Sequence, residues 1–438
     1  MSAIASPSSD LKTAIAALMA EARARTLLIV DGLTDADLHR QHDPLMSPIL
    51  WDLGHIAHFE ELWLTQNLDG PIRFSEMPGI YNPFEHPRAT RASLPIPGFE
   101  SMRERLAEIR DRVLERLETA DLDDRNPLLA DGYVYHMVLQ HEYQHNETIL
   151  QTLQLKLGDP YHPPTRSAVP EAFGDHSELD SMVDVTAGEY MIGTEDRSMA
   201  YDNERPRYQV RIPGFRIDRR PVTNGDYLEF MSDGGYADTR HWTAAGWEWL
   251  QQAQLESPKY WTRSGEDWVV RVMDRVTPPD PRRPVCHVSY HEAAAFAQWA
   301  GKRLPTEAEW EIAAAWDGGT GRRFPWGNDD ATRRDANVDQ LSFDTAPVGA
   351  YTTNVSPLGC YGMIGDVWEW TSSDFTGYPE FQSFPYAEYS EAFFGSDYKV
   401  LRGGSWATRP GAIRNTFRNW DYPIRRQIFS GFRCAIDA

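Results

Sequence analysis

Two histidines, His141 and His145, stand four residues apart in a segment that has the composition of a helix. Residues four apart lie one above the other on the same helical face, so both imidazoles could reach one metal ion from one side. The stretch 133–157 contains neither Gly nor Pro, and Gly158 follows it as a stop signal. The spacing therefore predicts a pair of metal ligands in the middle of a helix.

Two kinds of metal site fit this pair. The string from His141 to His145 matches the H-E-x-x-H pattern of zinc peptidases, in which Glu142 would be the general base. Alternatively, the third ligand comes from upstream, where His55 and His58 fall inside a second helical segment. Three neutral imidazoles leave the metal its full positive charge and open positions, which suits iron(II) and O2 but would also hold zinc. The spacing leaves His55 and His58 both open as the third ligand.

Four helices must position these side chains. Apolar residues recur at helical spacing in 10–31 and 98–121, and the two histidine-bearing segments complete the set. Ser47 can cap the segment that carries His55, with Pro48 at the first helical position. An antiparallel four-helix bundle with a metal site projecting inward is the economical architecture. The Pro-rich connection between about 70 and 97 is irregular, and we expect it to be a functional flap.

The second half of the chain differs from the first in its composition and in its hydrophobic pattern. Gly, Pro and small residues predict a linker at 166–182, which separates a helical domain at 1–165 from a domain at 183–438. In that domain, 208–223 predicts strands, whereas 289–304 and 306–318 predict amphipathic helices. We therefore expect a multidomain protein, with an all-α N-terminal half and an irregular α+β C-terminal half.

Composition excludes several classes of protein. The formal charge of −22 argues against a nucleic-acid or anionic-membrane partner, and no run of basic residues offsets it. No apolar stretch approaches the roughly 20 residues of a membrane span, and the N-terminus has no signal-peptide pattern. Cys286, Cys360 and Cys434 are too few and too widely spaced for a disulfide framework. These features predict a cytoplasmic protein.

Eight signatures in the second half resemble the formylglycine-generating-enzyme (sulfatase-modifying factor) family, whose fold is C-type-lectin-like. In chain order they are GEYMIGTED, DNERPRYQV, RPVTNGDYLEF, RLPTEAEWEIAA, FPWGN, NVSPLGCYGMIGDVWEWTSS, LRGGSW and GFRCA. The copper-dependent enzymes of that family use a cysteine pair near the C-terminus, whereas this segment contains only Cys434. The fold alone therefore does not assign the reaction.

The first half decides between the possible reactions. WDLGHIAHFE and HEYQHNE resemble motifs of DinB-type helical bundles, and this bundle joined to this second domain is similar to the ergothioneine-pathway sulfoxide synthases. The resemblance implies an iron(II)- and O2-dependent enzyme with small-molecule substrates. It joins the sulfur of gamma-glutamylcysteine to the imidazole of hercynine (N-alpha-trimethylhistidine) and oxidises that sulfur to a sulfoxide. By motif position, His55, His141 and His145 become the iron ligands. His58, one turn on, would then support a ligand from behind or serve in packing, and the H-E-x-x-H match would be coincidental.

The implied substrates need anchors for carboxylates and for a quaternary ammonium. Arg88 and Arg91, three residues apart in the irregular connection, suit the two carboxylates of gamma-glutamylcysteine. Gln144 shares the ligand face of its helix and could hydrogen-bond the hercynine imidazole or a water bound to it. By resemblance, a polar and aromatic cluster near the C-terminus reaches over the iron site: Asn419, Trp420, Asp421 and Arg425.

The sequence leaves the roles of the individual residues in that cluster open. Trp420 and Asp421 could stabilise a cation, or Asp421 could bind the substrate ammonium while Arg425 binds a carboxylate. The oxidation also needs a proton donor, for which Tyr378, Tyr386 and Tyr389 are candidates. We choose Tyr378, because it closely follows WEWTSS and precedes a proline that should hold the chain in a loop.

Other functions also fit the sequence. A paralogue could make a selenoneine- or ovothiol-type product from another donor, although ovothiol synthases commonly add a methyltransferase domain that is not seen before Ala438. Free cysteine could replace gamma-glutamylcysteine as the thiol. A non-catalytic metal- or ligand-binding protein is the alternative of a different class, and the presence of all three histidines weighs against it.

Overall fold

The computed structural model describes residues 7–68, 79–123, 125–171, 177–319 and 321–438. The chain forms two compact units, and each is described by itself. Unit 1 comprises Met1–Pro164, Asp196–Tyr201 and Phe384–Tyr386, and unit 2 comprises Thr165–Glu195, Asp202–Ser383 and Ala387–Ala438. Among the helices that the structure describes, none combines the length and apolar character needed to cross a membrane.

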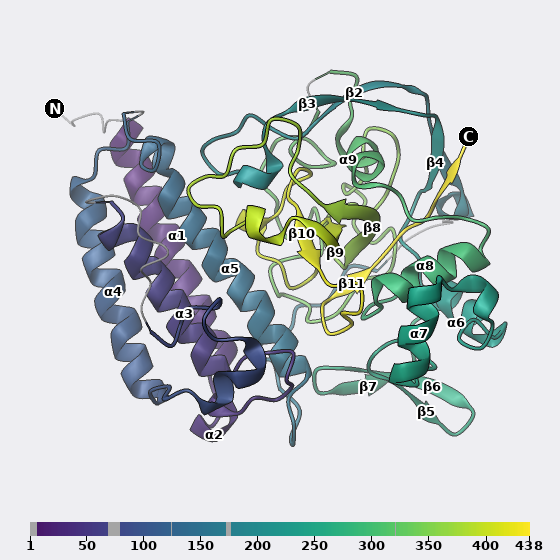
Figure 1. The fold of residues 1–438 in the computed structure, drawn as a ribbon, viewed down its shortest axis with the longest axis horizontal. Helices are drawn as coiled ribbons and strands as arrows, with labels where there is room; N and C mark the ends of the chain where they lie inside the picture. Colours follow the sequence, from purple (N-terminus) through teal and green to yellow (C-terminus); the bar gives the residue numbers. More distant parts are fainter. Residues whose placement is uncertain (1–6, 69–78, 124, 172–176, 320) are drawn as a thin grey trace. The chain divides into compact units, whose positions relative to one another are not determined.

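Unit 1 is the expected helical bundle, with its long helices side by side (Figure 1). These helices are α1 (Pro7–Val30), α3 (Ile49–Glu61), α4 (Phe99–Thr119) and α5 (Tyr133–Gln154). Helix α1 packs against α5, and α3 packs against both α4 and α5. Helix α4 buries its apolar stripe, as the periodicity predicted, at Met102, Leu106, Ile109, Val113 and Leu117.

Shorter helical segments connect the bundle helices. They are α2 (Asp35–His39), the π-helical turn η1 (Leu62–Gln66) and the 3₁₀ segments η3 (Arg88–Ser93) and η4 (Ala130–Gly132). The prediction that Ser47 caps α3 was wrong, because Pro48 occupies the cap position and makes no side-chain cap bond. The Ser47 hydroxyl instead accepts a hydrogen bond from Arg91 Nη1 at 2.7 Å. Residues 69–78 of the expected flap lie outside the described residues.

Unit 2 is the expected irregular α+β domain. Its helices are α6 (Asn224–Ser232), α7 (Ala244–Ala253), α8 (Tyr290–Trp299) and α9 (Glu307–Ala315). Its strands are β1 (Met182–Val185), β2 (Gly188–Ile192), β3 (Tyr208–Ile212), β4 (Phe215–Asp218), β5 (Trp261–Ser264), β6 (Asp267–Val272), β7 (Arg275–Thr277), β8 (Trp368–Phe375), β9 (Gly395–Arg402), β10 (Asn419–Asp421), β11 (Ser430–Gly431) and β12 (Ala435–Asp437). Capping boxes begin α8 and α9 at Ser289 and Thr306.

The strands of unit 2 pair over long sequence separations. Within the described residues they form sheets of order β1-β4-β12, β10-β9-β8-β11, β2-β3 and β5-β6-β7. Strand β12 pairs antiparallel with β4, and β11 pairs parallel with β8. One apolar core of unit 2 gathers residues of β1–β4 around Trp310 of α9, which is fully buried. The C-terminal strand β12 therefore belongs to the same sheet as β1, the first strand of the unit.

Candidate metal centre

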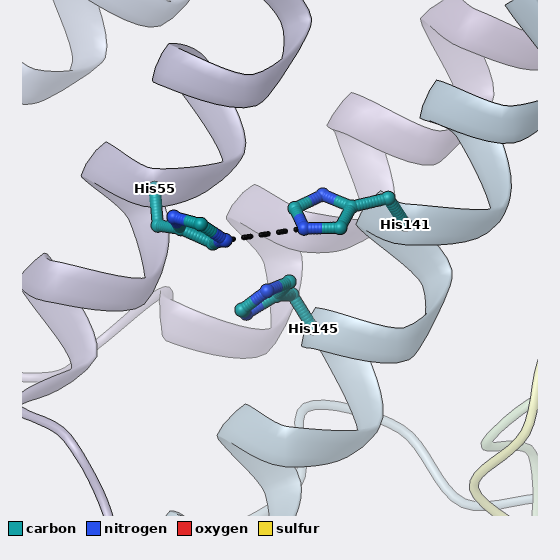
Figure 2. A group of neighbouring side chains, drawn as sticks. All are labelled: His55, His141 and His145. Atoms are coloured by element: carbon teal, nitrogen blue, oxygen red, sulfur yellow. Dashed lines mark hydrogen bonds between the residues drawn. The ribbon is translucent and has the colours of Figure 1, made fainter. Parts of the chain in front are cut away.

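The three histidines converge inside the bundle. His55 comes from α3, whereas His141 and His145 come from α5, and their rings face one another (Figure 2). The Nε2 atoms of His55 and His141 lie 3.2 Å apart, and one ligand atom from each histidine lies within 4.8 Å of the others. Metal–nitrogen bonds of about 2 Å place two ligand nitrogens about 3–3.5 Å apart. The arrangement thus fits one ion bound from one side by three imidazoles.

The outer nitrogens of two ligands have fixed partners. Nδ1 of His55 lies 2.8 Å from the carbonyl oxygen of Tyr81, and Nδ1 of His145 lies 3.2 Å from Oδ1 of Asp52. An acceptor at Nδ1 keeps the proton there and leaves Nε2 free to bind a metal. Burial, with the neighbouring His145, also lowers the pKa of His55 and of His141 well below the usual value. Both groups therefore favour the neutral form that coordinates metals.

A buried carboxylate shows that the site suits a cation. Asp52 is 1% exposed, and its Oδ2 has no hydrogen-bond partner among the described residues. Burial of a carboxylate is costly unless nearby positive charge offsets it. A divalent ion bound by His145 would supply that charge. Sequence reasoning missed Asp52, although it precedes His55 by three residues and therefore lies on the same face of α3.

Aromatic rings line the ligands. Trp51 stacks on His55 with ring centroids 4.9 Å apart, and Phe59 stacks on His141 at 3.8 Å. The guanidinium of Arg91 lies 3.5 Å from the centre of the Trp51 ring. These contacts fix the ligand rings and keep water from their faces. The sequence analysis singled out neither Trp51 nor Phe59.

Glu142 has no part in this cluster, which contradicts the peptidase interpretation. Its carboxylate accepts hydrogen bonds from Arg23 at 2.9 Å, from Arg110 at 3.0 Å and from Thr26 at 2.7 Å. Burial alone would raise the pKa of Glu142, but Arg23 and Arg110 outweigh it and lower that pKa. A carboxylate held by two arginines cannot serve as the general base of an H-E-x-x-H site.

Glu142 is one of four charged residues that we call the buried ion ring. Arg23 of α1 and Arg110 of α4 each contact both Glu60 of α3 and Glu142 of α5, at 2.6–3.0 Å. Each long helix contributes one residue, and all four side chains are buried. The ring thus ties together the two helices that carry the metal ligands.

His58 lies outside the ligand group, although the spacing left it open as a ligand. The three-residue cluster contains His55 instead. The His58 ring lies beside Tyr81, with centroids 6.3 Å apart, and the side chain is buried. His58 is thus buried beside Tyr81 and is not one of the three grouped histidines.

Arg88, Arg91 and Gln144 lie in unit 1 with the histidines. Arg91 is buried, donates to Ser47 and to the carbonyl of His86, and covers Trp51. Arg88 is on the same 3₁₀ segment and donates to the carbonyl of Leu45 at 3.2 Å. Burial lowers the pKa of Arg91 to about 10. The positive charge of Arg88 also lowers this pKa, whereas the negative charge of Asp52 raises it.

The C-terminal cluster belongs to unit 2. Asn419, Trp420 and Asp421 form β10, and Trp420 stacks on Phe375 with centroids 4.0 Å apart. Arg425 lies 3.3 Å from the carboxylate of Asp421. The four predicted residues are therefore local neighbours, with the acidic and basic members already paired.

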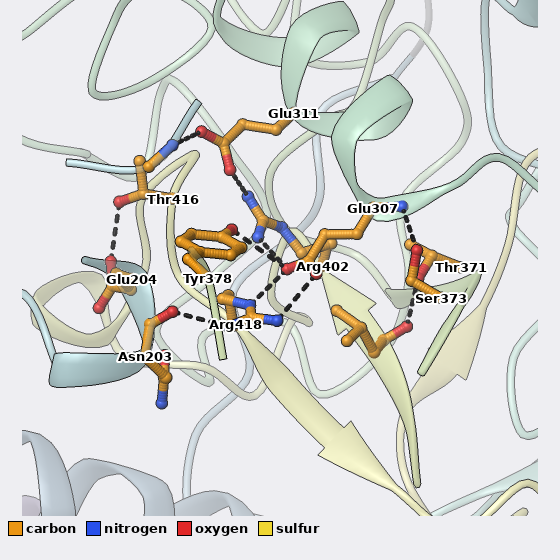
Figure 3. A network of polar contacts seen from close by, with 12 residues as sticks. Asn203, Glu204, Glu307, Glu311, Thr371, Ser373, Tyr378, Arg402, Thr416 and Arg418 are labelled. Atoms are coloured by element: carbon orange, nitrogen blue, oxygen red, sulfur yellow. Dashed lines mark hydrogen bonds and ion pairs between the residues drawn. The ribbon is translucent and has the colours of Figure 1, made fainter. Parts of the chain in front are cut away.

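Tyr378 lies in a buried network of unit 2 (Figure 3). Its hydroxyl donates to Glu307 at 3.4 Å, and the guanidinium of Arg418 lies 4.2 Å from the centre of its ring. Burial and the Glu307 charge raise the pKa of Tyr378 well above its usual value. These contacts weigh against Tyr378 as the proton donor, because its hydroxyl is engaged by a carboxylate inside the domain.

Tyr386 has different surroundings. The segment Phe384–Tyr386 belongs to unit 1, where Tyr386 stacks on Trp63 with centroids 4.9 Å apart. Its ring also lies 6.4 Å from Phe59, which stacks on His141. Of the three candidate tyrosines, Tyr386 thus lies near Phe59, which stacks on a ligand, whereas Tyr389 lies against Trp420 of unit 2.

Both halves of the chain match known protein families. Residues 167–438 match the sulfatase-modifying factor enzyme 1-like domain, and residues 18–149 match the DinB superfamily. The hercynine oxygenase of Mycobacterium tuberculosis is 45% identical over 97% of this chain and 98% of its own. That of Mycolicibacterium smegmatis is 44% identical over 96% and 97%. The formylglycine-generating enzyme of Mus musculus is 32% identical over 59% of this chain and 76% of its own.

Proposed function

Because the chain belongs to the hercynine oxygenase family, we propose that it uses iron(II) and O2 to join the sulfur of gamma-glutamylcysteine to the imidazole of hercynine as a sulfoxide. Membership of that family makes it an oxygenase of the ergothioneine pathway, with small-molecule substrates. The observation that carries the proposal is the convergence of three imidazoles, each with a ring nitrogen within 4.8 Å of a ring nitrogen of the other two. Such a neutral ligand set leaves open positions for a thiolate and O2.

Iron(II) bound there would supply the activation of O2. The chain itself holds the ligand rings in place through Tyr81 and Asp52, and it excludes water with Trp51 and Phe59. The proposed function needs two substrates side by side in one orientation, which accounts for much of the rate gain in such reactions. Gln144, next to His145 on α5, is the candidate contact for the hercynine imidazole.

Arg88 is the better residue for testing the choice of thiol substrate. Arg91 also packs on Trp51, so its replacement would disturb the structure as well as substrate binding. A charged hydrogen bond contributes about 1.5–3 kcal/mol, so Arg88→Ala should raise KM for gamma-glutamylcysteine roughly 10–100-fold. KM for free cysteine, which lacks the glutamyl carboxylate, should change much less. Steady-state kinetics with both thiols measure this difference. Equal effects on the two thiols would remove the basis for choosing gamma-glutamylcysteine.

We propose Tyr386 in place of Tyr378 as the proton donor, on the strength of its contacts beside the ligands. Tyr386→Phe should divert turnover from C–S coupling towards oxidation of the thiol alone, because the hydroxyl that delivers the proton is lost. Tyr378→Phe should keep the product ratio of the wild type. Chromatography of the products gives both ratios, and a shift with Tyr378→Phe alone would restore the original choice.

A non-catalytic binding protein is the alternative of a different class. It would bind a metal and the substrates but consume no oxygen. An oxygen electrode separates the two functions when iron(II)-loaded protein is mixed with hercynine and a thiol. Uptake that requires both substrates supports the oxygenase, whereas binding without uptake supports the alternative. A selenoneine- or ovothiol-type activity would instead appear as a different product from another donor.

A further inference from the structure

Asp52 is buried beside the histidine cluster in the first turn of α3. Its Oδ1 lies 3.2 Å from Nδ1 of His145, and its side chain is 1% exposed. The second oxygen, Oδ2, has no hydrogen-bond partner among the described residues. A buried carboxylate with one imidazole contact is poorly stabilised unless positive charge lies close by.

Two sources of positive charge can act on this carboxylate. The first is the guanidinium of Arg91. Burial lowers the pKa of Arg91, and the negative charge of Asp52 raises it. Its guanidinium nevertheless donates to Ser47 and to the carbonyl of His86. The other source is an ion bound among the three histidines, which bring one ring nitrogen each to within 4.8 Å of one another. Because Nδ1 of His145 faces Asp52, Nε2 is the nitrogen of that ring left to bind a metal.

We propose that Asp52 is a positioning residue of the metal centre, which acts through His145. Its carboxylate keeps the proton on Nδ1, directs Nε2 toward the metal and adds the negative charge that three neutral imidazoles lack. A carboxylate behind a metal-bound imidazole also raises the basicity of the ligand. This inference rests on the proposed metal centre, and it assigns a role to a residue outside the ligand set.

The test is the metal affinity of the full chain. Co(II), and Fe(II) under anaerobic conditions, are titrated in competition with a chelator into the wild type, Asp52→Asn and Glu61→Gln. Loss of a ligand's carboxylate partner typically weakens metal binding about 10–100-fold, and we expect that loss for Asp52→Asn. Glu61 is the matched control, because it lies on the same helix and pairs with Arg105 and Arg112 near the surface. Its affinity should equal that of the wild type.

A second measurement separates positioning from folding. Asp52→Asn removes a poorly compensated buried charge, so the thermal unfolding temperature of the metal-free protein should stay the same or rise. Unchanged metal affinity in Asp52→Asn would overturn the proposal, and so would weaker binding accompanied by a lower unfolding temperature without metal. Failure of the wild type to bind either ion in a 1:1 ratio would instead contradict the metal centre itself.

Discussion

Replacing His141 with Ala is expected to abolish stoichiometric iron binding and to lower the rate of coupled product formation by well over about 100-fold. The loss should exceed the 10–100-fold effect typical of outer contacts, because the substitution removes a ligand rather than its partner. His141 supplies the nitrogen that lies 3.2 Å from His55 in the cluster. Iron content after anaerobic reconstitution and the turnover rate measure the two effects.

His58→Ala is the matched control for this prediction. His58 is buried on the same helix as His55 but lies outside the ligand cluster. Its replacement removes a side chain of the same size and should leave the iron stoichiometry at that of the wild type. If His58→Ala lost the metal and His141→Ala retained it, the ligand set would be wrong.

Glu142→Gln is expected to destabilise the bundle by about 3–5 kcal/mol, since it breaks a buried ion network and leaves Arg23 and Arg110 short of a charge partner. Denaturant unfolding followed by helical circular dichroism measures the change. The exposed pair between Glu100 and Arg103 provides the control, because Glu100→Gln should cost less than about 1 kcal/mol.

A peptidase function predicts the opposite result for Glu142. A general base near a metal can be replaced by Gln with little loss of stability and a large loss of hydrolysis. Stability equal to the wild type would therefore contradict the buried ion ring as the role of Glu142. The expected result is destabilisation in the metal-free protein as well, because the bonds of the ring form between protein side chains and need no metal.

Much of unit 1 could be predicted from the sequence, because helices are local and their faces follow from periodicity. The spacing of His141 and His145 placed both on one face of α5, and motif position selected His55. Periodicity did not show which residues the side chain of Glu142 contacts. Its position between the two ligands in the sequence suggested a catalytic base. Its arginine partners lie 119 and 32 residues away in the chain, so only the packed bundle reveals them.

The tyrosine prediction was limited by the same cause. A loop residue carries no periodicity, so Tyr378, Tyr386 and Tyr389 were equivalent apart from their distance to a motif. Their contacts distinguish them: Tyr378 bonds Glu307 of α9, whereas Tyr386 packs on Trp63 of unit 1. In unit 2, amphipathic periodicity marked α8 and α9 correctly, but the pairing of β12 with β4 joins residues too distant for sequence patterns to show.

The identity of the product tests the central claim most directly. The protein is loaded with iron(II) without oxygen, then exposed to O2 with hercynine and either gamma-glutamylcysteine or cysteine, and the products are measured by mass spectrometry. The account predicts a coupled sulfoxide that contains hercynine and the thiol, formed faster with gamma-glutamylcysteine. Hercynine recovered unchanged with both thiols, from protein that holds one iron per chain, would contradict it.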